Sequence, residues 1–446
     1  MLLAMKKKEE YPTASALPPE LKIETLKRPI DLDIAVPGSK SISNRYLGMS
    51  ALATGEVVLT GLLRSDDTHY MAEGLKTLGF DVRPDWNAKT CRIMGEGGRI
   101  PAQGAELFTG AAGTAMRFLS AFVSLGDGRF RLDGTQRMRE RPIEDLLQGL
   151  RLLGVNARSE ADNGCPPVIV DACGLPGGTT QIDGSRSSQY ISAILQVAPY
   201  ARTPMTIEVT GDFVSRPFVE LTLKGMSDFG VLTATEGVRV YRPTHGVKYR
   251  SGTYDIEGDA TAASYFLGAA AILGGRCCVT NVGPNSAQGD ARFADVLRRM
   301  GCKVRTGFLA GKRGIEVYRD PKTPLNAIDV DMNDMPDVVL TLAVVCLFAE
   351  GTSTILNVGN LRIKETDRLS ALATELRRVG ATIEEGEDSL EITPGTPLVA
   401  AVETYDDHRM AMSLALAGLG QEGVTIKNPA CVSKTYPEFF KDLGRL

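Results

Sequence analysis

Six short stretches of the chain combine small or hydroxylic residues with charged ones, and each precedes a strongly apolar run. They read PGSKSISNR (37–45), TGAAGTAMR (109–117), DGSRSSQ (183–189), EGDATAAS (257–264), NDMPD (333–337) and YDDHR (405–409). A helix N-terminus offers unpaired N–H groups and a partial positive charge, so it binds anions such as phosphate. Capping alone would explain most of these stretches taken singly. In 37–45 and 183–189 several hydroxyls stand beside a cation, which favours an anion site.

Basic side chains also recur in the loops that follow the apolar runs. These loops read RMRERPI (137–143), NLRIKETDR (360–368) and VSKTYPEFF (432–440). The second is expected to place Lys364, Glu365 and Arg368 within one turn at the start of a surface helix. A solvated surface would explain any one of them. Together with Lys40, Arg45 and Arg409 they indicate a ligand with several negative charges. Arg binds carboxylate or phosphate through paired donors, and Lys acts as a mobile point charge that can also move a proton.

Three acids, Asp337, Glu365 and Asp407, lie among these cations. A carboxylate beside cations has a lowered pKa and acts as a base or as a charge partner. For Asp337, which follows Met335-Pro336 at the start of an apolar run, simple helix capping is the alternative explanation.

The elements that must position these residues form a sixfold repeat. A nearly all-apolar helix is expected after each of the six stretches, and such a helix has to be buried on every side. An amphipathic segment follows each one and ends at Gly79, Gly154, Gly230, Gly301, Gly380 and Gly444, at intervals of 64 to 79 residues. This interval far exceeds a solenoid repeat, so the pattern predicts compact domains with three repeats each.

The composition favours a globular protein and argues against nucleic-acid-binding and membrane-spanning classes. A chain of 446 residues with 43% hydrophobic and 23% charged residues is typical of a globular protein of two or three domains. A net charge of −4 argues against a nucleic-acid surface, and no apolar run is long enough to span a bilayer. Eight cysteines without a CxxC pair and only three histidines predict reduced thiols, a cytoplasmic location and no metal site.

Nine motifs, taken in their order along the chain, resemble those of the 5-enolpyruvylshikimate-3-phosphate (EPSP) synthase family. They are PGSKSISNR, GTAMR, RMRERPI, GSRSSQ, EGDATAASYF, NSAQGD, IKETDR, DDHRMAM and SKTYPEFF. The resemblance runs from about residue 32 to the C-terminus. The pieces RPIEDL and KETDR look like the glyphosate-sensitive branch. The family implies an α/β fold, a two-domain inside-out α/β barrel of six βαβαββ repeats with buried helices and outer sheets. The expected domains are 1–38 with 259–446, and 39–258, with residues 1–25 as a frayed extension and the active site in the cleft between the domains.

The resemblance also implies the ligands and the residues that hold them. Shikimate 3-phosphate would be bound by Lys40, Ser41, Arg45, Ser187, Ser188, Gln189, Ser215, Asp337, Asn360 and Lys364. Phosphoenolpyruvate would be bound by Lys40, Gly113, Arg141, Gln189, Arg368, Arg409 and Lys434. Glyphosate is the expected inhibitor. A monomer without metal, organic cofactor, nucleic-acid partner or membrane attachment is expected.

The implied reaction adds the 5-hydroxyl of shikimate 3-phosphate to C2 of phosphoenolpyruvate and then eliminates phosphate. Asp337 is the expected base, and Lys40 and Glu365 share the C3 proton and the leaving phosphate in a division that stays open. Ala111 and Phe218 depart from the Asn and Tyr usual in the family. The alternatives are a UDP-N-acetylglucosamine enolpyruvyl transferase, an RNA 3′-phosphate cyclase built from the same repeats, and a non-catalytic anion-binding module. The UDP-N-acetylglucosamine transferases use a mobile-loop cysteine in this region, and the stretch 109–160 contains none, which disfavours that alternative. The net negative charge disfavours the RNA cyclase, which would need a basic surface.

Overall fold

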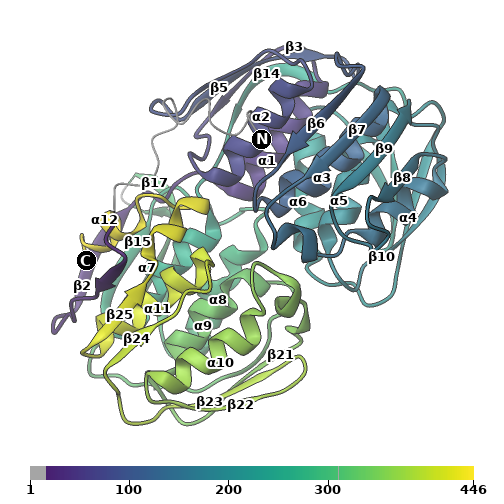
Figure 1. Ribbon diagram of the computed structural model, residues 1–446. Helices are drawn as coiled ribbons and strands as arrows, with labels where there is room; N and C mark the ends of the chain where they lie inside the picture. Colours follow the sequence, from purple (N-terminus) through teal and green to yellow (C-terminus); the bar gives the residue numbers. More distant parts are fainter. Residues whose placement is uncertain (1–16, 310) are drawn as a thin grey trace.

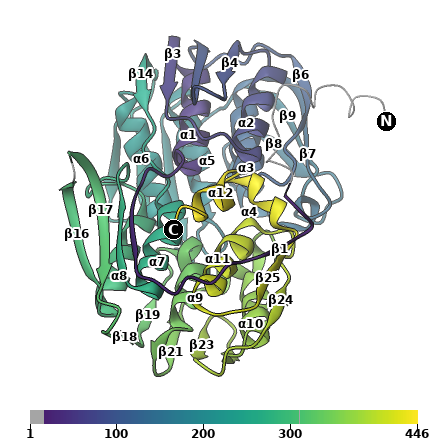
Figure 2. The ribbon, with the colours of Figure 1, turned by 90° about the vertical axis from the view of Figure 1, so that its left-hand side faces the viewer.

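The computed structural model describes residues 17–309 and 311–446, and it has two lobes, each with its own hydrophobic core (Figure 1). One core draws its buried residues from 42–256, and we call this part the upper lobe. The other core, that of the lower lobe, draws on residues 260–446 together with Ile23, Ile30, Leu32, Ile34 and Val36. Strand β2 (Ile30–Ile34) therefore lies in the lower lobe, where it pairs with β15 (Gly275–Val279), more than 200 residues away (Figure 1). Strand β1 (Glu20–Lys22) lies beside β25 (Val424–Lys427) in the same lobe (Figure 2).

Each lobe is surrounded by small sheets of one recurring design. Two parallel strands are followed by two antiparallel ones, as a strand–helix–strand–helix–strand–strand repeat requires. In the upper lobe the sheets are β14 (Arg250–Asp255), β3 (Thr54–Thr60), β5 (Thr90–Glu96) and β4 (Val82–Asp85); β6 (Gly104–Phe108), β7 (Asp127–Asp133), β9 (Val168–Cys173) and β8 (Asn156–Ser159); and β10 (Gly178–Asp183), β11 (Met205–Thr210), β13 (Val240–Pro243) and β12 (Thr233–Glu236).

The lower lobe repeats the design, with one strand fewer in its last sheet. Its sheets are β2 (Ile30–Ile34), β15 (Gly275–Val279), β17 (Lys312–Arg319) and β16 (Lys303–Leu309); β19 (Asp329–Asp331), β21 (Ser353–Leu356), β23 (Leu390–Thr393) and β22 (Thr382–Glu385); and β24 (Ala400–Val402), β25 (Val424–Lys427) and β1 (Glu20–Lys22). The short strands β18 (Leu325–Asn326) and β20 (Ala349–Glu350) form a separate pair.

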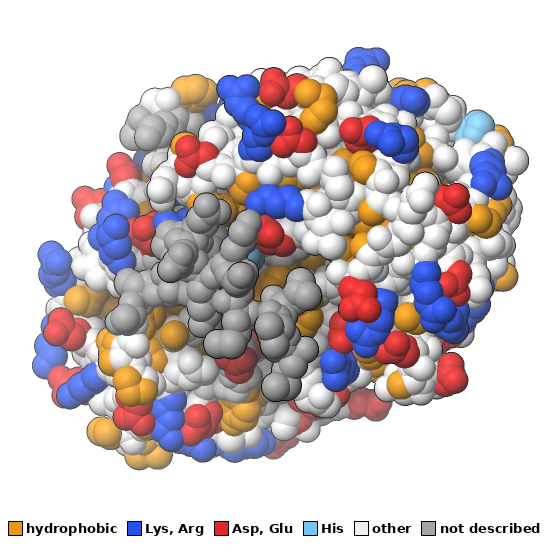
Figure 3. Space-filling view, turned by 45° about the horizontal axis from the view of Figure 1, so that its top comes forward, with side chains coloured by type: hydrophobic (Ala, Val, Ile, Leu, Met, Phe, Trp, Pro, Cys, Tyr) orange, Lys and Arg blue, Asp and Glu red, His pale blue; other side chains and the backbone are white. Residues whose placement is uncertain are grey.

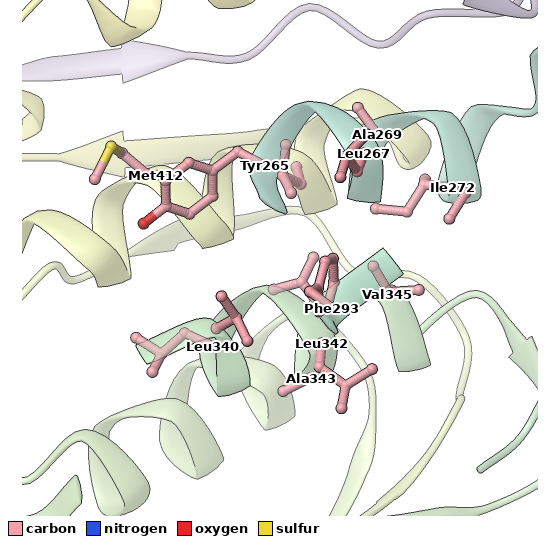
Figure 4. Close-up of a cluster of buried hydrophobic side chains, with 14 of the residues drawn as sticks. Tyr265, Leu267, Ala269, Ile272, Phe293, Leu340, Leu342, Ala343, Val345 and Met412 are labelled. Carbon is pink, nitrogen blue, oxygen red and sulfur yellow. The ribbon is translucent and has the colours of Figure 1, made fainter. Parts of the chain in front are cut away.

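The six apolar helices expected from the sequence are present, and they fill the two cores. They are α1 (Lys40–Leu52), α3 (Gly113–Phe122), α5 (Ser188–Val197), α7 (Ala260–Leu273), α9 (Val339–Cys346) and α11 (His408–Gly420). Every residue of α3 and of α9 is buried, because apolar side chains on all faces leave no side for water. Figure 4 shows side chains of α7 and α9 filling the space between helices of the lower core.

A second helix follows each buried one and ends at or just before the glycine noted in the sequence. These helices are α2 (Asp66–Thr77), α4 (Glu144–Leu152), α6 (Pro217–Asp228), α8 (Phe293–Arg299), α10 (Arg368–Arg378) and α12 (Phe439–Leu443). Five of the glycines have positive φ, as at Gly79 (φ +90), where the left-handed conformation ends the helix. Gly444 differs, with φ −66.

The chain passes between the lobes twice, and the two passages lie side by side. Gly38 and Gly258 form an antiparallel bridge, which is closed by hydrogen bonds from Ser39 N to Glu257 O and from Asp259 N to Pro37 O, both 2.8 Å. A Cβ placed on Gly38 would lie 1.8 Å from the carbonyl oxygen of Gly61, so this position has room only for glycine. The starts of α1 and α7 are thereby brought together between the lobes.

The expectation of a frayed N-terminus is wrong for the residues that follow Leu17. Strand β1 pairs antiparallel with β25, with Leu21 opposite Ile426, and Ile23 is 5% exposed. The sheet of β24 and β25 has a free edge, and the N-terminal segment satisfies its backbone groups. Residues 1–16, the rest of that expected extension, lie outside the described residues.

On the face drawn in Figure 3, acidic and basic side chains are interspersed, and no broad basic area is visible there. Within the described residues, no helix is long and apolar enough to cross a membrane. All eight cysteines are free thiols; six are buried, while Cys165 is partly buried and Cys173 is exposed.

Candidate active site

The start of α1 lies where the two lobes meet. The backbone N–H of Lys40 donates to Asp259 Oδ2 of the lower lobe at 2.9 Å, and Asp259 also caps α7 by accepting from Ala262 N. The Lys40 ammonium lies 3.9 Å from the carboxylate of Asp67, and their side chains are only 13% and 3% exposed. Lys40 is therefore placed by both lobes at once.

Two small adjoining cavities lie between the lobes beside this helix start. One is lined by Lys40, Ser41, Arg45, Thr114, Ser187, Ser188, Gln189, Ser215, Phe218, Asp337 and Lys364. The other is lined by Arg117, Arg141, Pro142, Arg186, Ser187, Gln189, Tyr190, Ile363 and Lys364. Ten residues expected from the sequence thus line these two cavities, although they come from both lobes and from four repeats.

Serine hydroxyl groups form one wall of the cavity that Lys40 and Arg45 line. Ser187 caps α5, where its Oγ accepts from Gln189 N at 3.2 Å. Ser215 has a left-handed backbone (φ +56), which is uncommon for a residue other than Gly, Asn or Asp. Its N–H donates to Asn333 O at 3.2 Å, and its Oγ accepts from Asn360 Nδ2 at 3.1 Å. Asn360, expected as a ligand residue, therefore reaches this wall from the lower lobe.

Three cations around the cavities have no carboxylate within 4.0 Å in the described part of the chain: Arg45 and Arg117, which are buried, and Lys364, which is partly buried. Burial lowers the pKa of Arg45 to about 9 and that of Arg117 to about 10, and it lowers the pKa of Lys364 to about 8. Taking a charge out of water without a counter-ion is costly. An anionic ligand in the cavities would supply the missing charge.

Arg45 is held by hydrogen bonds rather than by an ion pair. Its Nε donates to Thr222 Oγ1 and one terminal nitrogen to Phe218 O, each at 2.8 Å, while the guanidinium lies over the Phe118 ring, 5.2 Å from the centroid. These contacts fix the orientation of the guanidinium and leave its charge uncompensated.

A network of ion pairs continues from the cavity into the lower lobe. Arg368, which is 1% exposed, contacts Asp407 at 2.7 Å, Glu365 at 2.9 Å and Asp337 at 3.3 Å. Arg409 lies 2.8 Å from the other oxygen of Asp337. The guanidinium groups of Arg368 and Arg409 thus hold Asp337 at the edge of the cavity.

These cations determine the charge state of the acids. Burial would raise the pKa of Asp337, but the charges of Arg409, Lys364 and Arg368 outweigh it and hold that pKa well below its usual range. Burial would likewise raise the pKa of Glu365, and Arg368, Lys434 and Arg141 keep it low. Both acids are therefore carboxylates at neutral pH in this arrangement.

Lys434 connects the two lobes on the other side of the site. Its ammonium contacts Asp67 at 3.1 Å and Glu365 at 3.2 Å and donates to Ala111 O at 2.7 Å. Burial would lower the pKa of Lys434, but Asp67 and Glu365 raise it above its ordinary value. Four more expected residues, Glu365, Arg368, Arg409 and Lys434, thus lie together in one ionic network.

Gly113 and Arg141 are in direct contact. A Cβ built on Gly113 would lie 2.7 Å from a terminal nitrogen of Arg141, whose guanidinium is also 4.0 Å from Glu365. Arg141 is 7% exposed, and its Nε has no hydrogen-bond partner among the described residues. The bare backbone at Gly113 therefore makes room for this cation.

One local expectation is wrong. Lys364 and Glu365 do not lie in the first turn of a helix with Arg368, because α10 begins at Arg368 and is capped by Asp367, whose carboxylate accepts from Ser370 N at 3.1 Å. Lys364 and Glu365 occupy an irregular segment after the 3₁₀ turn Gly359–Ile363. Because Asp caps a helix N-terminus better than Lys or Glu does, the helix starts after Asp367 rather than at Lys364.

Asp67 and Arg117 were not among the expected ligand residues. Arg117 follows GTAM in a motif that the sequence singled out, so the signal was present. Asp67 gave no signal, since an acid in the first turn after Ser65 is ordinary for a helix. No group of three or more His, Cys, Asp and Glu side chains in the described ranges is arranged to hold a metal ion.

Comparisons with known proteins agree with one another. The family model for EPSP synthase (3-phosphoshikimate 1-carboxyvinyltransferase) matches residues 25–443. The 3-phosphoshikimate 1-carboxyvinyltransferase of Shewanella amazonensis is 46% identical over 430 residues, which are 96% of this chain and 99% of the relative. That of Vibrio cholerae is 46% identical over 427 residues, 94% and 98% of the two chains.

Solved structures give the same result for the fold. EPSP synthase from Acinetobacter baumannii superposes with a TM-score of 0.77 at 26% identity, covering 96% of this chain and 98% of that one. The enolpyruvyl transferase NikO from Streptomyces tendae, at 19% identity and a TM-score of 0.75, shares the fold. With a cationic cavity between two lobes of three repeats each, and a family model matched over nearly its whole length, this chain belongs to the EPSP synthase family.

Proposed function

We propose that this chain transfers the enolpyruvyl group of phosphoenolpyruvate to the 5-hydroxyl of shikimate 3-phosphate and releases phosphate, a step of the shikimate pathway towards the aromatic amino acids. The observation that carries the proposal is the set of buried and partly buried cations without carboxylate partners around cavities lined by both lobes. The two substrates together carry two phosphates and two carboxylates, and these anions would neutralise Arg45, Arg117 and Lys364.

The substrates divide the site between them. We assign shikimate 3-phosphate to the hydroxyl wall, where Ser187, Ser188 and Ser215 stand beside Lys40 and Arg45. Gln189, Asn360, Lys364 and Asp337 complete its contacts, and Ser41 lines the same cavity. Phosphoenolpyruvate is assigned to the end nearest the ionic network, with Lys40, Gly113, Arg141, Gln189, Arg368, Arg409 and Lys434.

The reaction is an addition followed by an elimination. The 5-hydroxyl oxygen bonds to C2 of phosphoenolpyruvate, C3 takes up a proton, and the hydroxyl proton passes to a base. C3 then gives up a proton, the bond from C2 to the phosphate oxygen breaks, and phosphate leaves. Asp337 is the proposed base, while Lys40 and Glu365 serve the C3 proton and the leaving phosphate. Cations fixed around the site stabilise the negative charge that moves onto phosphate.

Ligand binding would tune the proposed base. Arg409 and Arg368 hold the pKa of Asp337 low in the arrangement seen here, which makes it a weak base. Anionic groups of the substrates would share these guanidinium charges, weaken their hold on the carboxylate, and raise its pKa towards that of a working base.

A phosphate-release assay tests the proposal. The chain is incubated with phosphoenolpyruvate and either shikimate 3-phosphate or UDP-N-acetylglucosamine, and inorganic phosphate is followed. Release should require shikimate 3-phosphate. Release only with UDP-N-acetylglucosamine would identify the related sugar transferase, and release with neither would contradict the proposed activity.

We also propose that the enzyme acts as a monomer in the cytoplasm and that glyphosate competes with phosphoenolpyruvate. One chain supplies the residues around the cavities, so no second copy is needed to complete them. Eight free thiols suit a reducing compartment. The cations that would bind the carboxylate and phosphate of phosphoenolpyruvate would also bind the carboxylate and phosphonate of glyphosate.

A further inference from the structure

Arg137 of the upper lobe reaches across to the backbone of the lower lobe. Its Nε donates to Glu365 O and a terminal nitrogen donates to Lys364 O, each at 3.0 Å, across 228 and 227 residues of sequence. The other terminal nitrogen bonds Glu140 at 3.0 Å. Because Nε and one terminal nitrogen share an edge of the planar guanidinium, the two crossing bonds run in parallel to successive carbonyl groups.

The segment that receives these bonds is irregular. Residues 364–366 form a bend between the 3₁₀ turn Gly359–Ile363 and α10, so no helix or strand fixes them. The side chain of Lys364 nevertheless lines both cavities, and Glu365 contacts Arg368 and Lys434. Two side chains with proposed roles thus depend on a backbone whose position needs outside support.

Several other contacts between the lobes use residues of the site itself. Lys434 bonds Asp67, and Asn360 bonds Ser215. Arg137 differs because its guanidinium lines neither cavity and is partly exposed at the rim. Its crossing bonds can form only when the lobes are together, since donor and acceptors belong to different lobes.

We propose that Arg137 is a positioning residue, which fastens the backbone of Lys364 and Glu365 to the upper lobe when the lobes close and so sets both side chains against the substrates. The inference rests on the proposed function. Since these bonds belong to the closed, reacting arrangement, their loss should lower kcat and kcat/KM together. A lysine keeps the charge but lacks the paired donors, so it should not replace this arginine.

The test compares Arg137→Ala and Arg137→Lys with Arg139→Ala. Arg139 stands in the same loop and makes two hydrogen bonds to Asp133 of its own lobe, and it has none to the lower lobe in the described residues. Both Arg137 variants should lose about tenfold or more in kcat, the scale of hydrogen bonds from a charged donor. Arg139→Ala should stay within about twofold of the wild type.

Two further readouts separate positioning from a merely structural role. Added guanidinium ion should restore part of the kcat of Arg137→Ala while the midpoint of thermal unfolding stays unchanged. Trp86, the sole tryptophan, lines a cavity with Tyr436 and Pro437 of the lower lobe, so its fluorescence should report closing. Arg137→Ala should need several-fold more shikimate 3-phosphate for the half-maximal fluorescence change.

If the wild type is active and Arg137→Ala has the same kcat as Arg139→Ala, the inference about Arg137 is overturned and the proposed function still stands. A lowered unfolding midpoint without rescue by guanidinium would also overturn it, because the arginine would then support the fold. If the wild type itself releases no phosphate with shikimate 3-phosphate, the proposed function fails, whatever the variants do.

Discussion

Adding one methyl group at Gly113 should weaken the binding of glyphosate more than that of phosphoenolpyruvate. Gly113 is the first residue of α3, and its φ lies outside the left-handed region, so alanine fits the backbone there. The new Cβ would lie 2.7 and 2.9 Å from the two terminal nitrogens of the Arg141 guanidinium and 3.0 Å from its central carbon. Ordinary contacts are about 3.5–4.0 Å, so the guanidinium has to move by roughly 1 Å.

The size of the effect follows from the packing of Arg141. The side chain is 7% exposed and lies between Gly113 and Glu365, which leaves it little room. Overpacking of this kind costs about 1–3 kcal/mol. At about 1.4 kcal/mol per factor of ten, this cost corresponds to roughly 5- to 150-fold in binding. Glyphosate is the longer ligand, so its inhibition constant should rise by well over tenfold and the KM for phosphoenolpyruvate by less.

The assay is phosphate release at varied phosphoenolpyruvate with and without glyphosate, for wild type and Gly113→Ala. Repeating it in an Arg141→Lys background provides the control, since the methyl acts through the guanidinium and its extra effect should shrink to less than about twofold there. Unchanged inhibition of Gly113→Ala would show that Gly113 does not line the pocket. A wild type that resists millimolar glyphosate would show that Ala111 and Phe118, which flank the site, have already altered it.

Three other changes test the remaining assignments, and a fourth measurement tests the closing of the lobes. Lys40→Met should abolish turnover without unfolding the chain; more than a tenth of wild-type kcat would refute the role of Lys40. Asp337→Ala should lower kcat by about 10²-fold or more, the scale of a general base, with shikimate 3-phosphate still bound; a pure loss of affinity would make Asp337 a binding residue. Burial lowers the pKa of Lys364 to about 8, so its proton is lost as pH rises through 8. Therefore kcat/KM for shikimate 3-phosphate should fall above that pH. In Lys364→Arg the fall should occur at a higher pH, because an arginine keeps its proton. Small-angle scattering should show a smaller radius of gyration with saturating shikimate 3-phosphate, since its charge offsets the repulsion between facing cations; an unchanged radius would count against the closing of the lobes.

The sequence predicted the repeat and the helices that carry the site. Apolar residues on all faces of α3 and α9 leave burial as the only possibility, and the hydroxyl and cationic residues before α1 and α5 lie at helix starts, as expected. These features are local, so composition and spacing are enough to find them. The resemblance then supplied residue roles that no local pattern contains.

Contacts between distant segments could not be predicted in the same way. The three arginines of 137–143 look alike in sequence, yet Arg141 lies against Gly113, Arg139 binds Asp133 and Arg137 crosses to the other lobe. Which arginine does what depends on the relative position of two lobes. The pairing of β1 with β25 was missed for the same reason, because three residues spanning 20–22 carry little signal until the open edge of a sheet is known.

The two adjacent passages at Gly38 and Gly258 also constrain the order in which a growing chain can fold. Strand β2 pairs with β15, and β1 pairs with β25, more than 200 and more than 400 residues further along. The upper lobe can therefore complete itself on the ribosome while the segment before it waits without its partners. The first described residues to leave the ribosome are among the last to be placed, because the lower lobe is finished only after β25 has been made.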